Sequence, residues 1–213
     1  MRTTSKTLRS WCAGVALGLA LGGVSSSTYA QEKVAIFAGG CFWCVESDFD
    51  QVPGVIRTIS GYTGGHTDNP TYRKITGGGT GHREAVQIVY DATKVSYRAL
   101  VDIFWRSVDP TDAGGQFCDR GHSYSTAIFV ANADERAIAE ATKDAIESDK
   151  LLSAPIVTTI EDASTFFPAE KYHQDYYEKN PVRYKFYRYS CGRNATVKKV
   201  WGTEAYAGLP AND

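Results

Sequence analysis

The segment VAIFAGGCFWCVESDF, residues 34–49, joins a strand pattern, two glycines and a helix pattern. Its first residues form a short apolar run of the kind found in buried strands. After the glycines, Val45 and Phe49 recur at helical spacing, and a Pro-Gly pair after Val52 ends the pattern. The segment therefore predicts a strand that turns sharply into a helix, with Cys41 where the helix begins.

The remaining sequence predicts further strands and helices. Strands are expected at residues 55–62, 84–90, 126–131 and 156–160, and helices at residues 96–108, 135–152 and 168–180. Up to residue 131 the order is β-α-β-β-α-β, the split arrangement of ferredoxin-like folds. We therefore expect an α+β two-layer sandwich with helices packed on a mixed sheet, followed by an irregular C-terminal tail after Pro181.

The first thirty residues have the features of a secretory signal peptide. Basic residues precede an apolar run, and small residues precede a cleavage site after Ala30. We expect residues 1–30 to be removed and residues 31–213 to form one domain, exported to a bacterial periplasm. The apolar run is too short for a comfortable membrane span, so stable membrane insertion is not expected. An uncleaved anchor is the alternative.

Charge and histidine spacing argue against two kinds of site. The chain has 23 Lys and Arg and 24 Asp and Glu, and removal of the three basic residues among the first thirty leaves a net charge of −4. This mild acidity argues against a nucleic-acid partner. The four histidines show no metal-ligand spacing with the cysteines, so no metal site is expected.

Four cysteines remain without the signal peptide: Cys41, Cys44, Cys118 and Cys191. In an exported protein, an even number of cysteines is compatible with two structural disulfides. A chain of this length does not need such cross-links to build a core, so redox chemistry is the competing interpretation. The cysteine count alone leaves both open.

Cys41 occupies a position that suits a nucleophile. Free amide hydrogens and the positive end of the helix dipole favour a thiolate there, and the thiolate is the reactive form of cysteine. Phe42 and Trp43 point about 100° apart around the helix axis, so both cannot face the core squarely. One or both are expected to form an apolar wall that fits a methyl group beside the sulfur. The alternatives are a structural cysteine at a tight turn and ordinary core packing of the two rings.

Glu84 is a candidate general acid. In the alternating strand pattern it shares a face with the apolar residues Val86, Ile88 and Tyr90. Desolvation at the edge of such a surface raises a carboxyl pKa and keeps the group protonated near neutral pH. The alternative is that the strand begins one residue later and that Glu84 is solvated.

Several blocks of the sequence occur in an order that resembles the methionine sulfoxide reductase A family. They are GGCFWCVESDFDQVPGV, SGYTGG, NPTYRKI, TGHREAVQIVYD, YRALVDIFW, DPTD and AEKYHQDYYEKNP. The resemblance runs from about Val34 to Asn180 and thins out in the tail. Because several blocks are long and specific, it carries expectations about the activity and about individual residues.

The resemblance implies a thiol-dependent reductase that returns methionine S-sulfoxide, free or in proteins, to methionine, and so repairs oxidised proteins. Cys41 would attack the sulfoxide sulfur, and Glu84 would protonate the oxygen. The expected substrate-binding residues are Phe42 and Trp43 for the methyl group, Tyr72 and Tyr124 for the oxygen, and Asp119 for the shape of the pocket. The sulfenic acid on Cys41 would become a disulfide that a thioredoxin-like dithiol reopens, without a metal or organic cofactor.

The sequence leaves open which thiol resolves the sulfenic acid. Cys191 is favoured as the resolving thiol because it stands on the expected irregular tail, free to reach the site. Cys44 is the runner-up, or a second relay, because it lies one helical turn from Cys41. Cys118 lies in a loop and could also approach.

Two other functions are alternatives to the interpretation as a methionine sulfoxide reductase. A general thiol–disulfide oxidoreductase could use the Cys-x-x-Cys pair alone, but that class usually places its aromatic residue before the pair. A non-enzymatic secreted binding domain with two structural disulfides would lose its fold on mild reduction. The sequence favours a monomeric exported methionine sulfoxide reductase over both.

Overall fold

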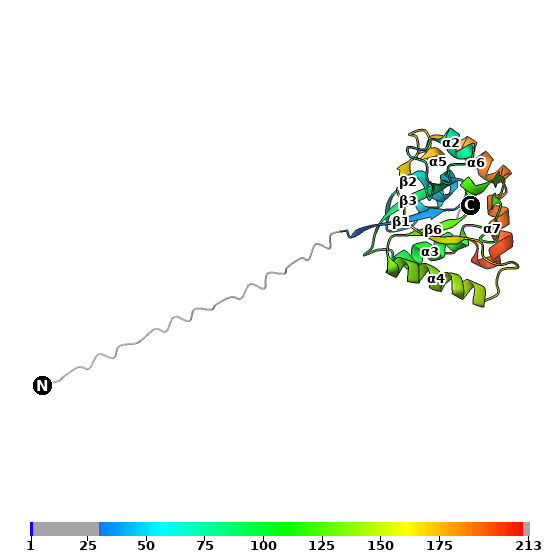
Figure 1. Cartoon of the computed structure of the whole chain (residues 1–213). Coiled ribbons are helices and arrows are strands. Elements are labelled where there is room, and N and C mark those ends of the chain that lie inside the picture. The colour runs from blue at the N-terminus through cyan, green and yellow to red at the C-terminus, as the bar shows by residue number, and fades with distance from the viewer. Residues whose placement is uncertain (2–29, 211–213) are drawn as a thin grey trace.

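The computed structural model describes residue 1 and residues 30–210, and its main element is a six-stranded sheet in order β7-β6-β1-β3-β2-β8 (Figure 1). The strands are β1 (Glu32–Ala38), β2 (Val55–Thr63), β3 (Arg83–Asp91), β4 (Gly115–Gln116), β5 (Asp119–Arg120), β6 (Ala127–Val130), β7 (Thr159–Asp162) and β8 (Phe167–Pro168). The α-helices are α1 (Phe42–Phe49), α2 (Tyr72–Thr76), α3 (Tyr97–Arg106), α4 (Ala133–Ser148), α5 (Tyr176–Lys179), α6 (Pro181–Ser190) and α7 (Arg193–Trp201). Short 3-10 turns lie at η1 (His122–Tyr124) and η2 (Gly202–Glu204), and β4 pairs with β5 in a separate hairpin.

The centre of the sheet has the expected ferredoxin-like arrangement. Strands β6, β1, β3 and β2 lie side by side, and every neighbouring pair among them is antiparallel. Strand β7 then adds parallel to β6 after the α4 crossover, and β8 adds antiparallel to β2. The sheet is therefore mixed, and the predicted α+β class is confirmed. Strand β7 begins later than expected, at Thr159, because the amide of Val157 donates instead to the carbonyl of Pro110 (2.8 Å).

The main core lies between the sheet and helices α1, α3 and α4. Phe37 of β1 is fully buried, and its ring centre lies 5.5 Å from that of Phe49 in α1 and 4.9 Å from that of Phe104 in α3. Val86 of β3 belongs to the same core and is fully buried. Because side chains alternate along a strand, Glu84 shares this helix-covered face of β3.

The expected helix at residues 168–180 is mostly wrong. Pro168 lies in β8 and pairs with Gly61, and the helical part begins only at α5. The Gln174 side chain accepts from the amide of Ser60 (2.9 Å) and donates to the carbonyl oxygens of Ser60 and Ala169 (both 2.9 Å). These long-range bonds hold the segment along the edge of β2, which the local helical pattern does not reveal.

The irregular tail expected after Pro181 is also wrong, because helices α6 and α7 occupy it. Pro181 stands at the first turn of α6, a favourable position for proline. In α7, Val197 and Trp201 are buried, and the indole of Trp201 donates to the carbonyl of Val108 (2.8 Å). The tail thus packs as part of the domain, and its helices depend on contacts with residues far away in the sequence.

The expected signal peptide lies almost wholly outside the described residues, since residues 2–29 are not among them. Across residue 1 and residues 30–210, no helix has the length and apolarity that a membrane span requires. The division of the chain at residue 30 therefore stays a prediction.

Candidate active site

Cys41 is the N-cap residue of α1, directly after the turn that follows β1. Its carbonyl accepts from the amides of Cys44 (3.1 Å) and Val45 (3.4 Å). The preceding Gly40 has φ +82°, and a Cβ there would lie 2.5 Å from the Cβ of Gln116. Glycine is therefore required on both grounds. The turn places Cys41 at the helix start, as expected, with 7% of its surface exposed.

The Cys41 thiol is less acidic than its place at a helix start suggests. Burial raises its pKa well above the usual value, and the hydrogen bond to Cys44 and the charges of Cys44 and Glu84 act in the same direction. For Cys44, the hydrogen bond from Cys41 and the positive charges of Arg193 and Arg188 outweigh burial and lower the pKa to about 7. Cys41 therefore holds its proton more tightly, and Cys44 is the cysteine of the pair that forms a thiolate more readily.

Glu84 is buried next to the turn that carries Cys41. It is 1% exposed, and its Oε2 accepts from the amide of Phe42 (3.1 Å). Its other oxygen, Oε1, has no hydrogen-bond partner among the described residues. Burial raises the pKa of Glu84 to about 8 against the opposing effect of that hydrogen bond. The carboxyl is thus mainly protonated at neutral pH, and one of its oxygens has no hydrogen-bond partner among the described residues.

The two aromatic residues after Cys41 have different surroundings. Phe42 is 1% exposed, with its ring centre 4.9 Å from that of His173 and 6.4 Å from that of Tyr72. Trp43 is half-buried, stacks on Tyr176 at 3.8 Å and donates from Nε1 to Nδ1 of His173 (3.1 Å). Trp43 therefore presents an apolar ring that is held in place and partly exposed, whereas the Phe42 ring lies mainly in the core.

Tyr72, the first residue of α2, and Tyr124, the last residue of η1, come together beside Glu84. The two hydroxyls lie close enough to influence each other's pKa, and the charge of Glu84 acts on both. Burial, followed by the charge of Glu84, raises the pKa of Tyr72 to about 12, and the same causes raise the pKa of Tyr124. The backbone of Tyr72 is held by Glu170, whose Oε1 accepts from its amide (3.0 Å). Both phenols thus stay protonated and can donate to an oxygen beside Glu84.

Asp119 reaches the site through a tyrosine that the sequence did not single out. The hydroxyl of Tyr187 in α6 donates to Oδ2 of Asp119 and also lies within hydrogen-bonding reach of the Cys41 sulfur. Burial raises the pKa of Asp119, while the bond from Tyr187 and the charge of Arg193 oppose that rise. Asp119 therefore orients Tyr187 against the Cys41 sulfur.

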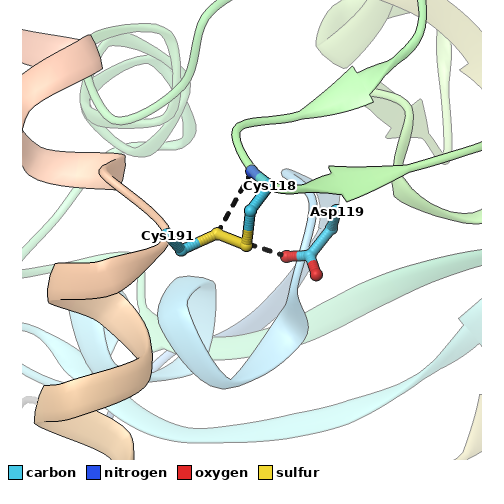
Figure 2. A group of neighbouring side chains, drawn as sticks. All are labelled: Cys118, Asp119 and Cys191. Carbon is cyan, nitrogen blue, oxygen red and sulfur yellow. Dashed lines mark hydrogen bonds between the residues drawn. A yellow bond between two sulfur atoms is a disulfide. The ribbon is translucent and has the colours of Figure 1, made fainter.

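Cys118 and Cys191, the other two cysteines among the described residues, form a disulfide beside this network (Figure 2). Cys118, which is exposed, and Cys191, which is half-buried, have Cα atoms 4.9 Å apart. Oδ2 of Asp119 lies 3.9 Å from the Cys191 sulfur. Although these three residues are grouped like metal ligands, both sulfurs are already bonded to each other. In this state Cys191, favoured by the sequence as the resolving thiol, is not a free thiol, whereas Cys41 and Cys44 are free.

A family model described as peptide methionine sulfoxide reductase matches residues 33–205. The chain belongs to this family. The match extends through helices α6 and α7, beyond the region where the sequence blocks alone resembled it. The predicted family and its class, an oxidoreductase that reduces methionine sulfoxide, are thereby confirmed.

Individual relatives agree with the family assignment. Peptide methionine sulfoxide reductase MsrA 2 of Rhizobium meliloti is 55% identical over 180 residues, covering 84% of this chain and 89% of its own. MsrA of Bacillus subtilis is 48% identical over 174 residues, covering 82% of this chain and 98% of its own. Among solved structures, methionine sulfoxide reductase A of Corynebacterium diphtheriae has a TM-score of 0.63 at 34% identity, covering 71% of this chain and 76% of its own.

Within this reductase fold, the residues expected from the sequence gather around one turn. The gathered residues are Cys41, Phe42, Trp43, Cys44, Tyr72, Glu84, Asp119 and Tyr124. Sequence reasoning missed Tyr176 and Tyr187, whose rings lie against that of Trp43, and it missed His173, which accepts from the Trp43 indole. Their tyrosine-rich segment carried no spacing that could have distinguished these residues from structural ones.

Proposed function

We propose that this reductase acts on the S epimer of methionine sulfoxide, free or in proteins, with Cys41 as nucleophile and Glu84 as general acid. The observation that carries the proposal is the buried carboxyl of Glu84, bound at 3.1 Å to the amide of Phe42 in the same turn as Cys41. A protonated carboxyl beside a cysteine suits a substrate whose oxygen must leave as its sulfur is attacked.

The reduction of the sulfoxide by Cys41 needs no proton from outside the site. The Cys41 sulfur bonds to the sulfoxide sulfur while Glu84 gives its proton to the oxygen. The oxygen then passes to Cys41 as methionine leaves, and the thiol proton of Cys41 restores Glu84. The products are methionine and Cys41 sulfenic acid. Tyr72 and Tyr124 donate hydrogen bonds to the oxygen during this transfer.

Trp43 forms the methyl-binding wall in this scheme, and Phe42 supports it from the core. Trp43 is held on one side by Tyr176 and at its indole nitrogen by His173, so its ring does not need to be ordered when substrate binds. Asp119 shapes the pocket through Tyr187.

The proposal is tested by comparing the two epimers of a methionine sulfoxide peptide. With a small dithiol as reductant, we expect methionine from the S epimer and essentially none from the R epimer, because a fixed ring and fixed donors accept one arrangement of methyl and oxygen. Chromatography of the peptide products measures both rates on one enzyme preparation. Equal rates for the two epimers would contradict the proposed geometry.

The resolving step is assigned here to Cys44, the runner-up from the sequence. Cys44 is a free thiol one turn from Cys41 and is hydrogen-bonded to it. Both are too buried for a protein reductant to reach, at 7% exposure for Cys41 and 2% for Cys44. Cys118 is exposed, so the Cys118–Cys191 pair suits the thioredoxin-like dithiol. In this relay, the reduced outer pair exchanges with the Cys41–Cys44 disulfide and becomes the disulfide of Figure 2.

Removal of the outer pair should separate small reductants from protein reductants. The Cys118→Ser/Cys191→Ser variant is expected to keep most of its turnover with a small dithiol and to lose thioredoxin-supported turnover by about 10-fold or more, because the buried disulfide is inaccessible to a protein. Parallel assays of NADPH consumption and of dithiol-driven methionine formation measure the two routes. Unchanged thioredoxin-supported turnover would exclude the outer pair, and with it Cys191, from the route.

The proposal also includes export of the protein and a monomeric state. The signal-peptide features of residues 1–30 support export to a bacterial periplasm, and an N-terminal sequence beginning at Gln31 in the exported protein would test it. The enzyme is proposed to act as a monomer without metal or organic cofactor, because thiols alone carry the two electrons through the relay. A second subunit, found in solution, that supplied a site residue would contradict this.

A further inference from the structure

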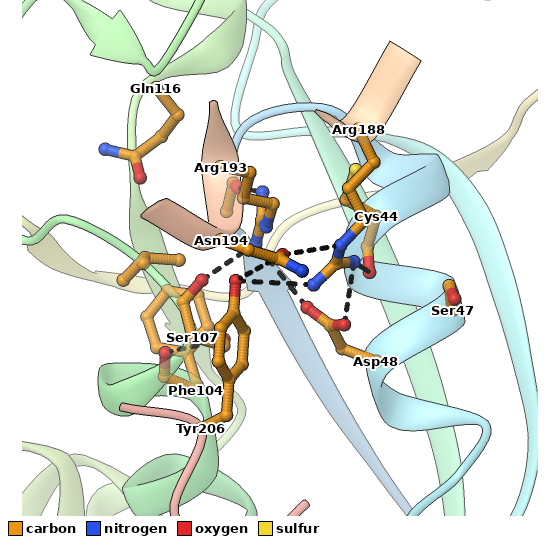
Figure 3. A network of polar contacts seen from close by, with 12 residues as sticks. Cys44, Ser47, Asp48, Phe104, Ser107, Gln116, Arg188, Arg193, Asn194 and Tyr206 are labelled. Atoms are coloured by element: carbon orange, nitrogen blue, oxygen red, sulfur yellow. Dashed lines mark hydrogen bonds and ion pairs between the residues drawn. The ribbon is translucent and has the colours of Figure 1, made fainter. Parts of the chain in front are cut away.

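Helices α6 and α7 bring two arginines to the Cys44 side of α1 (Figure 3). Arg188 and Arg193 lie on either side of Cys191 in the chain, and their side chains are 11% and 1% exposed. Nη1 of Arg188 lies 3.5 Å from the carbonyl oxygen of Cys44. The disulfide of Cys191 with Cys118 ties this stretch to the loop beside the active site. No step described above uses the two arginines.

The charges of this cluster do not balance by themselves. Asp48 pairs with both arginines: Nη1 of Arg188 lies 2.8 Å from Oδ1, and Nη2 of Arg193 lies 3.8 Å from Oδ2. The Asp48 side chain is 1% exposed. One carboxylate against two guanidinium groups leaves one buried positive charge of the trio uncompensated. Because unpaired buried charges are strongly unfavourable, the cluster stabilises a further anion beside it.

The other hydrogen-bond partners of the two arginines are neutral. They are the hydroxyls of Tyr184 (2.9 Å) and Tyr206 (3.3 Å), Oδ1 of Asn194 (2.8 Å), and the carbonyls of Gly39 (3.0 Å) and Ser107 (3.0 Å). Burial raises the pKa of both tyrosines, which keeps them protonated. Neutral partners satisfy N–H groups but do not cancel charge.

The remaining ionisable groups near Cys44 leave it as the site for that anion. Cys41 keeps its proton, because burial and its hydrogen bond to Cys44 raise its pKa. Glu84, with a pKa of about 8, is protonated at neutral pH. The charge of Arg193 also acts on Asp119, but less than burial and the hydrogen bond from Tyr187 do, and Arg188 is not among its partners. Cys44 has a pKa of about 7, lowered in part by both arginines, which agrees with this assignment.

We propose that Arg188 and Arg193 are positioning residues that hold Cys44 as a thiolate, ready to resolve the sulfenic acid on Cys41. The inference rests on the proposed function, in which Cys44 is the resolving thiol. In that step the Cys44 sulfur bonds to the Cys41 sulfur and the S–O bond of the sulfenic acid breaks. The hydroxide that leaves takes the proton of Glu84 and becomes water. The product is the Cys41–Cys44 disulfide, with no external oxidant or reductant.

The test is a single-turnover experiment on the reduced enzyme that follows two signals across a range of pH. Methionine formation reports the first step, and loss of dimedone-reactive sulfenic acid reports resolution. In Arg188→Gln and in Arg193→Gln, we expect the pH midpoint of resolution to rise by about one unit or more, which is about a tenfold lower thiolate fraction on the acidic side. Methionine formation should keep its pH profile.

Three further variants separate charge from structure. Arg188→Lys and Arg193→Lys keep the positive charge and should keep the midpoint close to that of the wild type. Arg183→Gln removes an exposed arginine from the same helix α6 and should change nothing. If Arg193→Gln fails to fold, as shown by its melting curve, Arg188→Gln and the two lysine variants still decide the question.

The outcomes that overturn the inference differ from those that overturn the proposed function. An unchanged midpoint in the folded glutamine variants, or an equal shift in the lysine variants, would show that the arginines do not act through charge on Cys44. Unchanged resolution in Cys44→Ser would remove Cys44 from the step, and the inference with it. Absence of methionine formation in the wild type would instead contradict the proposed function itself.

Discussion

The Cys41→Ser variant is expected to lose methionine sulfoxide turnover by more than about 1000-fold. A serine hydroxyl is a far weaker nucleophile than a thiol and cannot form the disulfide that completes the cycle. The fold should survive, because Cys41 is the N-cap of α1 and serine is a preferred residue at that position. We therefore expect an equal or higher melting temperature together with the loss of turnover.

Melting curves and product chromatography on one preparation check both halves of this expectation. Loss of turnover together with loss of the fold would leave the chemical role of Cys41 without support. Turnover that survives in the folded variant would show that another group attacks the sulfoxide. The second result would remove Cys41 from the centre of the mechanism.

Glu84→Gln is expected to slow methionine formation by about 10²- to 10⁴-fold, the usual contribution of a general acid. Glutamine keeps the shape and can accept from the amide of Phe42, but it cannot give a proton to the oxygen. Since the pKa of Glu84 is about 8 and the protonated form is the acid, the wild-type first step should slow as pH rises past about 8. The variant should lack this fall. Single-turnover methionine formation as a function of pH measures both effects.

Glu46→Gln is a matched control for that experiment. Glu46 is also a buried carboxyl, and burial raises its pKa to about 7, but its Oε2 accepts from the amide of Asp175 (3.1 Å) rather than facing Cys41. Its replacement should leave the alkaline fall of the first step in place. If Glu84→Gln kept the wild-type rate and pH profile, the proton would come from elsewhere.

The sequence predicts the sheet and the turn at Cys41 because both depend on local pattern. Alternation along β3 indicates that Glu84 is buried, and the two glycines indicate the sharp turn. The tail does not follow from local pattern. Helices α6 and α7 bury a full guanidinium, that of Arg193, against carbonyl groups of Gly39 and Ser107, and no local periodicity predicts that arrangement.

The state of Cys41 shows a limit of local reasoning about charge. A helix start favours an anion by about 0.3–1 kcal/mol at an exposed site. Burial of a thiol with a second sulfur and Glu84 beside it acts in the opposite direction and is the larger effect, so the pKa rises. Tyr187 was missed for a related reason, since its approach to Cys41 follows from the packing of α6 and not from any motif.

The most direct test of the central claim uses a protein in which Cys41 is the remaining active-site thiol. A Cys44→Ser/Cys118→Ser/Cys191→Ser variant, mixed with a peptide carrying S-sulfoxide, can complete the first step but cannot resolve it. The account predicts about one methionine per protein molecule and the added mass of one oxygen atom on the Cys41 peptide, which dimedone traps. No methionine, or the oxygen on another residue, would contradict the account.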